Sequence, residues 1–251
     1  MPMRLVKIFG ERNTGTNVLD ILIQRNSRSC VLPSTEYHID RAAATQAWSL
    51  PPMRREEAID AVYDDVSDLL AWKHCATDFA DARAFKGALV LFTVRHPISW
   101  LLALFKRPYH LLGSLPPTLA EFLDSDWRTA RRERLGCTAL RPIALYNTKI
   151  ASYLAFAGRL AEAGVPHHFV RQEDLALSQY RTFRAIGPDL LKPQGLFLPV
   201  VRSSKTGGKS LLAYKRYYAA ESWKTEIAGI EDAVTEQVDW AQLARFGYAP
   251  S

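Results

Sequence analysis

Residues 10–17 place two glycines and several short polar side chains directly after an apolar run. The residues that matter are Gly10, Thr14, Gly15, Thr16 and Asn17. The glycines allow a tight backbone turn, and the first amides of a helix over the apolar residues 18–23 would point at a bound anion. The segment predicts a phosphate-binding loop between a strand and a helix, with a simple tight turn as the alternative.

The loop lacks the side chains that a Walker A nucleotide site requires. That site needs Lys after its second glycine, to reach the terminal phosphates, and then Ser or Thr to hold magnesium. Thr16 and Asn17 stand at those two places. A nucleotide that transfers a less charged group without a metal, such as a sulfuryl group, therefore fits better than ATP.

Three further candidates follow predicted strands. Lys73 and His74 end a short predicted strand over residues 71–74, and Arg95 follows the strongly apolar residues 88–94. The carboxyl ends of parallel strands meet at one edge of a sheet, so these side chains are expected beside the loop. Together they predict a second anion-binding group next to the first.

The elements that would position these residues alternate between strands and helices. Strands are predicted over residues 4–9, 71–74, 88–94 and 167–170, and helices over 18–23, 53–70, 98–105 and 142–163, with an irregular stretch over 25–52. This order predicts an α/β fold: one three-layer domain over residues 1–251, with a central parallel sheet flanked by helices, of the P-loop nucleotide-binding type. The length and the apolar content of the chain suffice for one sizeable hydrophobic core.

The composition of the chain indicates which kinds of ligand and which cellular compartment to expect. The net charge of +6 favours anionic ligands, although the densest basic cluster, residues 128–134, is interpreted as a solvated helix face rather than a nucleic-acid surface. Three widely spaced cysteines indicate a reduced, cytoplasmic protein. No apolar run approaches the roughly 20 residues of a membrane-spanning helix.

The chain resembles the sulfotransferases that use 3'-phosphoadenosine 5'-phosphosulfate (PAPS), over nearly its whole length. Residues 10–17 are similar to the family's 5'-phosphosulfate loop, and residues 93–100 to its 3'-phosphate segment. Residues 170–175 resemble a recurring segment of the family, 202–209 its late loop of glycines and basic residues, and 243–248 its usual ending. The resemblance implies a transfer of a sulfuryl group from PAPS to a hydroxyl.

The resemblance also implies roles. His74 is the implied catalytic base, and Lys73 or Arg12 would stabilise the leaving phosphate. The implied PAPS-binding residues are Arg12, Asn13, Thr14, Gly15, Thr16, Asn17, Arg95, Ser99, Lys205, Gly207, Gly208 and Lys209. Arg95 would grip the 3'-phosphate with two donors at once. No metal is expected.

The chain departs from the family at two places. Asn13 stands where members usually have Lys or Arg, with Arg12 the nearest cation, and Ala103 stands where members often have Ser, with Ser99 one helical turn earlier. If His74 is not the base, His38 and His110 are the next candidates.

Aromatic residues in the irregular segments favour a carbohydrate or glycoconjugate acceptor, because rings stack well on sugars. A small-molecule P-loop kinase and a non-catalytic nucleotide- or nucleic-acid-binding module are the alternative functions. Magnesium dependence would indicate the kinase, and steeply salt-dependent binding would indicate the nucleic-acid module.

Overall fold

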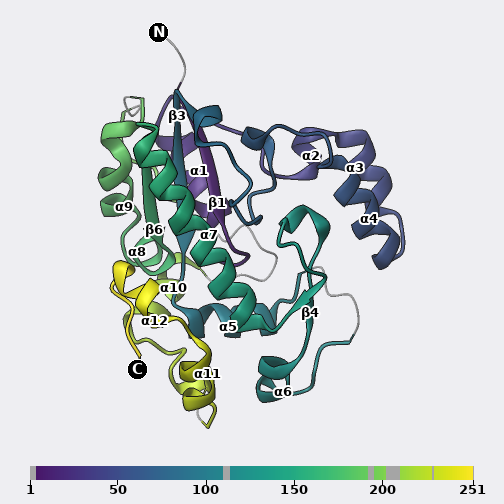
Figure 1. Cartoon of the computed structure of the whole chain (residues 1–251). Helices are drawn as coiled ribbons and strands as arrows, with labels where there is room; N and C mark the ends of the chain where they lie inside the picture. Colours follow the sequence, from purple (N-terminus) through teal and green to yellow (C-terminus); the bar gives the residue numbers. More distant parts are fainter. Residues whose placement is uncertain (1–3, 110–113, 192–194, 202–209, 228, 251) are drawn as a thin grey trace.

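The computed structural model describes residues 4–109, 114–191, 195–201, 210–227 and 229–250. Its main sheet has four strands in the order β2-β1-β3-β6, and every neighbouring pair is parallel (Figure 1). The strands are β1 (Leu5–Gly10), β2 (Cys30–Val31), β3 (Ala88–Val94) and β6 (His167–Arg171). The predicted α/β class with a parallel sheet flanked by helices is confirmed.

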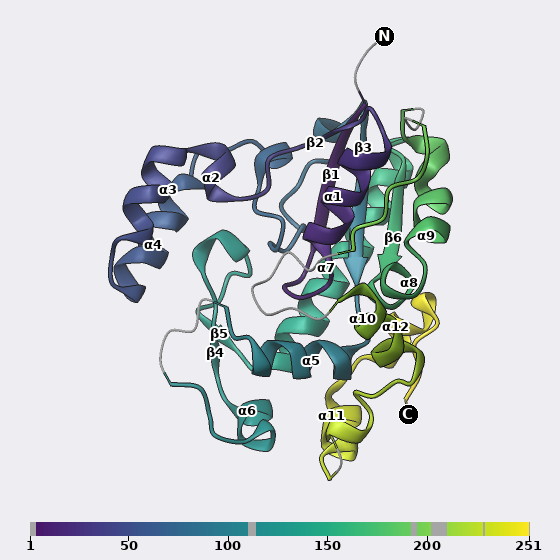
Figure 2. The same cartoon turned by 180° about the vertical axis from the view of Figure 1, so that it is seen from behind.

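Helices cover both faces of this sheet. On one face, α1 (Thr16–Asn26), α8 (Gln172–Leu177) and α9 (Gln179–Ile186) pack against the side chains of Leu89 and Leu91. On the other, α7 (Pro142–Glu162) packs against Val90 and Phe92, so that α1 and α7 lie on opposite sides (Figures 1 and 2). Every residue of β3 is buried, as expected for a central parallel strand covered twice.

Most of the remaining elements lie at the carboxyl end of the sheet or beside it. The other helices are α2 (Glu36–Ile39), α3 (Arg41–Trp48), α4 (Pro52–Val62), α5 (Pro97–Lys106), α6 (Leu119–Asp124), α10 (Leu211–Ala219), α11 (Glu231–Gln237) and α12 (Trp240–Leu243). The described ranges also contain the short 3-10 helices η1 (Asp68–Leu70), η2 (Ala82–Phe85), η3 (Arg131–Glu133), η4 (Gly187–Asp189), η5 (Thr225–Ile227) and η6 (Ala244–Phe246). Strands β4 (Trp127–Arg128) and β5 (Ala139–Leu140) form an antiparallel pair. Helices α2, α3 and α4 project beside the sheet as a small helical unit (Figure 1).

Most of the long predicted elements are present. The predicted strands over 4–9, 88–94 and 167–170 correspond to β1, β3 and β6, and the predicted helices over 18–23, 98–105 and 142–163 correspond to α1, α5 and α7. Pro97 occupies the first turn of α5, where its missing amide hydrogen costs nothing. No helix within the described ranges has both the length and the apolar character needed to cross a membrane.

Two predictions about the N-terminal half are wrong. The segment over 25–52 is not irregular, because it contains α2 and α3 as well as β2. The helix predicted over 53–70 ends at Val62, and only the short η1 turn follows. The aspartates at 64, 65 and 68 explain this early end, since negative charge is unfavourable at the carboxyl end of a helix.

Residues 71–74 are not a strand. They form a turn, in which the Cys75 amide donates to the Trp72 carbonyl at 3.1 Å. One backbone bond ties the turn to β1, from the Gly10 amide to the Lys73 carbonyl at 2.9 Å. The apolar residues that suggested a strand are buried for another reason, since Trp72 packs against the helical unit.

The basic cluster over 128–134 is not a solvated helix face. It comprises β4 and η3, and Arg132 is only 3% exposed. The Arg132 guanidinium contacts the carboxylates of Glu56 and Asp60, each at 2.5 Å. These contacts attach α4 to the segment between β4 and β5, so Arg132 serves the fold.

We expect Arg132→Met to lower the free energy of unfolding by about 3–5 kcal/mol, because it removes the buried guanidinium that pairs with the carboxylates of Glu56 and Asp60. Arg131→Ala is the matched control. Arg131 pairs with Asp64 on the surface, with side-chain exposures of 64% and 45%, so its loss should cost less than about 1 kcal/mol. Urea unfolding followed by circular dichroism measures both. Equal losses for the two variants would show that the buried contacts are not what attaches α4.

Candidate functional site

The loop between β1 and α1 has a backbone that only glycine fits at two positions. Gly15 has a φ of 90°, and a Cβ there would lie 1.8 Å from Gln172 Oε1. A Cβ at Gly10 would lie 1.9 Å from the Thr93 hydroxyl oxygen. The side chains of Gln172 and Thr93 therefore fill the space next to the two glycines, which fixes the course of the loop in front of α1.

The amino end of α1 has no side-chain cap. Gly15 is the N-cap residue, no acidic residue lies in the first turn, and the first intrahelical bond runs from the Leu19 amide to the Gly15 carbonyl. The amides of residues 16–18 therefore have no acceptor within the helix. Such a helix end attracts anions through its amides and its dipole.

The Lys73 ammonium lies at this helix end. Its Nζ donates to the Asn17 side-chain oxygen at 2.6 Å, and the residue is only 7% exposed. Burial lowers the pKa of Lys73 from its usual value, with the charges of Asp20 and Glu36 opposing the shift. A cation thus stands beside the uncapped amides.

His74 is held against the carboxyl end of β1. Its Nδ1 lies 2.5 Å from the Gly10 carbonyl oxygen, and its ring packs edge-on against Trp72 at 5.0 Å. A carbonyl can only accept, so this bond assigns the hydrogen of a neutral ring to Nδ1 and leaves the lone pair on Nε2. Burial lowers the pKa of His74 well below its usual value, and Lys73 and Arg12 add to the shift. The neutral ring is the form suited to accept a proton.

Arg95 connects the end of β3 to the loop. Its Nη1 donates to the Asn13 carbonyl oxygen and its Nε to the Ser99 hydroxyl, each at 2.9 Å. Tyr218 of α10 covers it, with the guanidinium 5.7 Å from the ring centre. Ser99 is fully buried, so it orients Arg95.

Hydrogen bonds from the interior hold the loop at Thr14 and at Arg12. The Thr14 hydroxyl donates to the Glu11 carbonyl at 2.5 Å and lies 2.6 Å from the Thr93 hydroxyl. Trp100 donates from its indole nitrogen to the Arg12 carbonyl at 3.0 Å. These bonds fix the shape of the loop, so any contact of Thr14 with a ligand would come from the backbone.

The assignment of Arg12 to an anionic ligand requires correction. Arg12 is 2% exposed, and its guanidinium contacts Glu133 at 2.7 Å and Glu11 at 3.2 Å. Two buried carboxylates neutralise its charge, so Arg12 is a structural residue of the loop. Of the two cations predicted to stabilise the leaving phosphate, only Lys73 remains available, and it contacts Asn17 at the start of α1.

The structure brings most of the predicted site together at one edge of the sheet. Contacts join Lys73 to Asn17, His74 to Gly10, and Arg95 to Asn13. His38 lies in the helical unit, exposed, with its Nδ1 3.1 Å from the Thr35 hydroxyl. The predicted residues His110, Lys205, Gly207, Gly208 and Lys209 fall outside the described residues.

Sequence reasoning missed the buried charges behind this edge. Glu133 and Lys149 are completely buried, and both contact the loop or the His74 segment. One signal for Lys149 was present. It lies four residues after Leu145 and four before Tyr153, which places a charge within the apolar face of a long helix.

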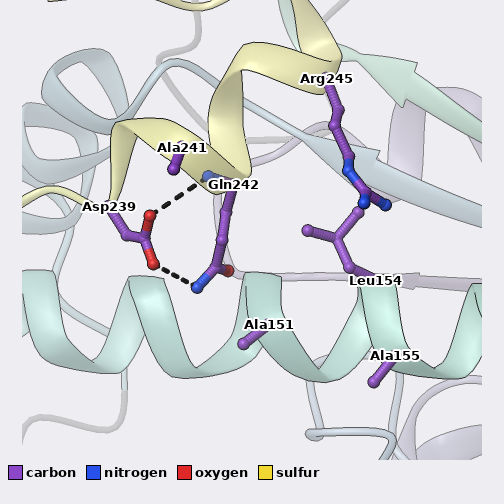
Figure 3. Close-up of a pocket in the computed structure, with 7 residues that line it drawn as sticks. All are labelled: Ala151, Leu154, Ala155, Asp239, Ala241, Gln242 and Arg245. Carbon is purple, nitrogen blue, oxygen red and sulfur yellow. Dashed lines mark hydrogen bonds between the residues drawn. The ribbon is translucent and has the colours of Figure 1, made fainter.

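A surface pocket of about 500 Å³ lies elsewhere, between α7 and the C-terminal elements (Figure 3). It is lined by Ala151, Leu154, Ala155, Asp239, Ala241, Gln242 and Arg245. None of the predicted site residues contributes to it. In the described part of the chain, no group of three or more His, Cys, Asp or Glu side chains is arranged to hold a metal ion.

No known protein-family model matches this chain, and no curated protein sequence matches it either. The sequence motifs and the geometry at the carboxyl edge of the sheet are therefore what indicate a function.

Proposed function

We propose that this protein is a sulfotransferase that moves a sulfuryl group from PAPS to an acceptor hydroxyl without a metal ion. The observation that carries the proposal is the convergence of three parts at one sheet edge: the uncapped end of α1, the Lys73–His74 turn and Arg95. Each part meets a different need of the reaction. The end of α1 would bind one anionic group, the turn would supply a cation and a base, and Arg95 would bind a second anionic group.

The amino end of α1 suits a donor with a phosphate beside a sulfonate, because it has no side-chain cap and no acidic residue in its first turn. Arg95 uses Nε and Nη1 for internal bonds, and among the described residues no partner is found for its Nη2. A guanidinium held in this way is suited to a phosphate at a second position of the nucleotide.

PAPS supplies an activated sulfuryl group. In the proposed reaction the acceptor oxygen forms a bond to sulfur while the bond from sulfur to the phosphate oxygen breaks. His74 Nε2 takes the proton of the acceptor hydroxyl, and Nδ1 remains bonded to the Gly10 carbonyl. The Lys73 ammonium and the α1 amides meet the charge that develops on the leaving phosphate.

Lys73 thus takes the role for which the family usually uses a cation at the position of Asn13. For the acceptor we retain a carbohydrate or glycoconjugate hydroxyl, since Tyr37 and Trp48 are 43% and 45% exposed on the helical unit. Trp127, another aromatic residue outside the long helices and strands, is 2% exposed and belongs to the core.

A transfer assay tests the proposal. Purified protein is incubated with sulfur-labelled PAPS and a panel of sugars, glycosides and phenols, in the presence of EDTA. We expect labelled product from a hydroxyl-bearing acceptor, at a rate that magnesium does not raise. Transfer of phosphate from labelled ATP in the presence of magnesium, with no transfer from PAPS, would contradict the proposal.

A further inference from the structure

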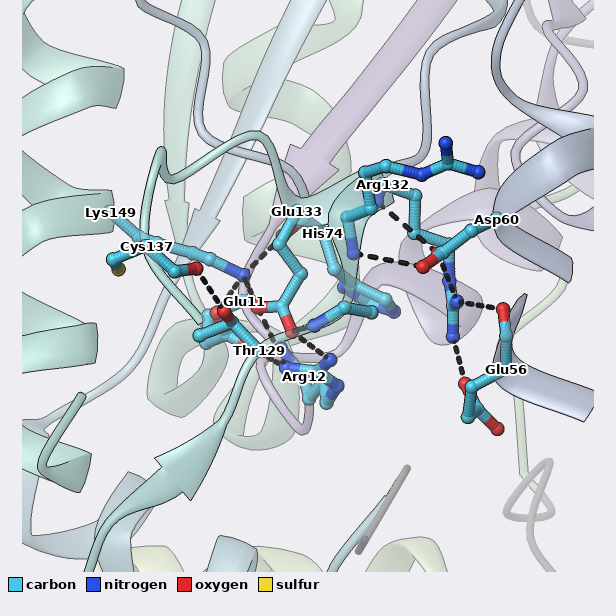
Figure 4. A network of polar contacts seen from close by, with 12 residues as sticks. Glu11, Arg12, Glu56, Asp60, His74, Thr129, Arg132, Glu133, Cys137 and Lys149 are labelled. Atoms are coloured by element: carbon cyan, nitrogen blue, oxygen red, sulfur yellow. Dashed lines mark hydrogen bonds and ion pairs between the residues drawn. The ribbon is translucent and has the colours of Figure 1, made fainter. Parts of the chain in front are cut away.

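Four buried charged side chains form a closed cluster behind the candidate site (Figure 4). Glu11 and Arg12 come from the loop, Glu133 from η3 and Lys149 from α7, and none is more than 2% exposed. Each acid contacts each base: Arg12 lies 3.2 Å from Glu11 and 2.7 Å from Glu133, and Lys149 lies 2.6 Å from both. The four formal charges cancel.

Stability alone is a weak reason for such a cluster. Removing four charges from water costs free energy that their mutual attraction only partly returns, and apolar residues of similar volume often stabilise a fold equally well. The charges of Arg12 and Lys149 nevertheless overcome the effect of burial and hold the pKa of Glu133 well below its usual range. Glu133 is thus held in its charged form.

The cluster contacts the turn that carries His74 from two sides. Lys149 Nζ donates to the His74 carbonyl, and the Ala76 amide donates to the Glu133 carbonyl at 2.8 Å. Trp72 connects the cluster to the imidazole itself. Its ring lies 5.0 Å from the Arg12 guanidinium and packs edge-on against His74.

We propose that this cluster positions His74 and keeps its imidazole uncharged, which makes Glu133 and Lys149 positioning residues for the reaction. The catalytic part of this inference rests on the proposed function. The part that concerns the charge state of His74 does not, because it can be tested on the free protein.

The direction of the effect follows from the groups that surround the ring. Besides burial, Lys73 from its own turn, Arg12 from the loop and Lys149 from α7 all lower the pKa of His74, and the bond to the Gly10 carbonyl raises it. The carboxylates of Glu11 and Glu133 pair with Arg12 and Lys149 and offset their charges. Lys149→Met would leave the cluster with a net negative charge, which favours the protonated ring. Glu133→Gln would leave it with a net positive charge, which disfavours that ring.

An NMR titration of histidine-labelled protein tests this inference, with His74→Asn used to assign the signal. In the wild type, we expect His74 to carry its hydrogen on Nδ1 and to stay neutral at pH 6.5. Lys149→Met should raise the pH of half-protonation by about one unit and Glu133→Gln should lower it. The double variant, whose charges again cancel, should return toward the wild type.

Several outcomes would overturn the inference. They are a wild-type His74 that titrates near pH 6.5, single variants that shift in the same direction, and single variants that do not shift. If circular dichroism shows that a single variant does not fold, the His74 titrations of the wild type, the double variant and the charge-conserving Lys149→Arg test the inference in its place. Lys149→Arg is expected to leave the titration unchanged.

The titration needs neither donor nor acceptor, so its result is separate from that of the transfer assay. Opposite shifts in a protein that transfers no sulfate would support the cluster's effect on His74 and reject the proposed function. If transfer is observed, the acidic limb of its rate–pH profile should move with the NMR titration in each variant. A limb that stays fixed would show that Glu133 and Lys149 do not act through His74.

Discussion

His74→Asn is expected to lower kcat for sulfuryl transfer by about 10²–10⁴-fold, the usual contribution of a positioned base. The Asn side chain still offers an amide donor to the Gly10 carbonyl, which His74 contacts at 2.5 Å in the wild type. The variant therefore removes the proton acceptor while keeping the contact with β1. The KM for PAPS should change little, since the α1 amides and Arg95 are untouched. Initial rates with labelled PAPS measure both constants.

The pH profile gives the same prediction an independent readout. Burial, Lys73 and Arg12 lower the pKa of His74, so the neutral ring persists through neutral pH and is lost only well below pH 6.5. The wild-type transfer rate should stay constant as the pH falls to that range and then decrease. In His74→Asn this decrease at acidic pH should be absent. His38→Asn is the matched control because His38 is exposed on the helical unit. A large loss in His38→Asn with none in His74→Asn would move the base to His38.

Arg95→Ala is expected to weaken binding of 3'-phosphoadenosine 5'-phosphate by about 100-fold or more, through the loss of charge-assisted hydrogen bonds to the 3'-phosphate. Arg95→Lys retains the charge without the planar fork, so its loss should be intermediate. Calorimetric titration measures the Kd of each variant.

Arg95 also holds the loop through the Asn13 carbonyl, so a control must separate the two effects. Adenosine 5'-phosphate, which lacks the 3'-phosphate, provides it. We expect Arg95→Ala to change the affinity for this ligand by less than about threefold, against the roughly 100-fold loss predicted from charge-assisted bonding. Equal losses for both nucleotides would mean that Arg95 acts only by shaping the loop.

The core of the fold was predictable because its signals are local. An unbroken apolar run gave β3, and Pro97 marked the start of α5 directly after it. The loop and α1 followed from glycine spacing over a few residues. Lys73, His74 and Arg95 were expected at one edge because they follow strands or apparent strands, and their contacts with the loop agree with that placement.

The errors came from interactions between distant parts of the chain. Besides its neighbour Glu11, Arg12 pairs with Glu133, 121 residues away, and the sequence around Arg12 does not signal this second contact. Arg132 similarly pairs with Asp60 across 72 residues, which turned an apparently solvated cluster into a buried attachment. Trp72 resembled part of a strand because it is apolar, yet it packs on helices. Periodicity detects burial, but not what a residue is buried against.

The most direct test of the account is a calorimetric titration of the wild-type protein with 3'-phosphoadenosine 5'-phosphate in EDTA, compared with ATP and magnesium. The uncapped end of α1, Lys73 and Arg95 predict tight one-to-one binding of the bisphosphate, at least tenfold stronger than that of ATP, a margin of about 1.4 kcal/mol. Preference for ATP with magnesium, or no binding of either nucleotide, would contradict the assignment of this sheet edge as a sulfotransferase donor site.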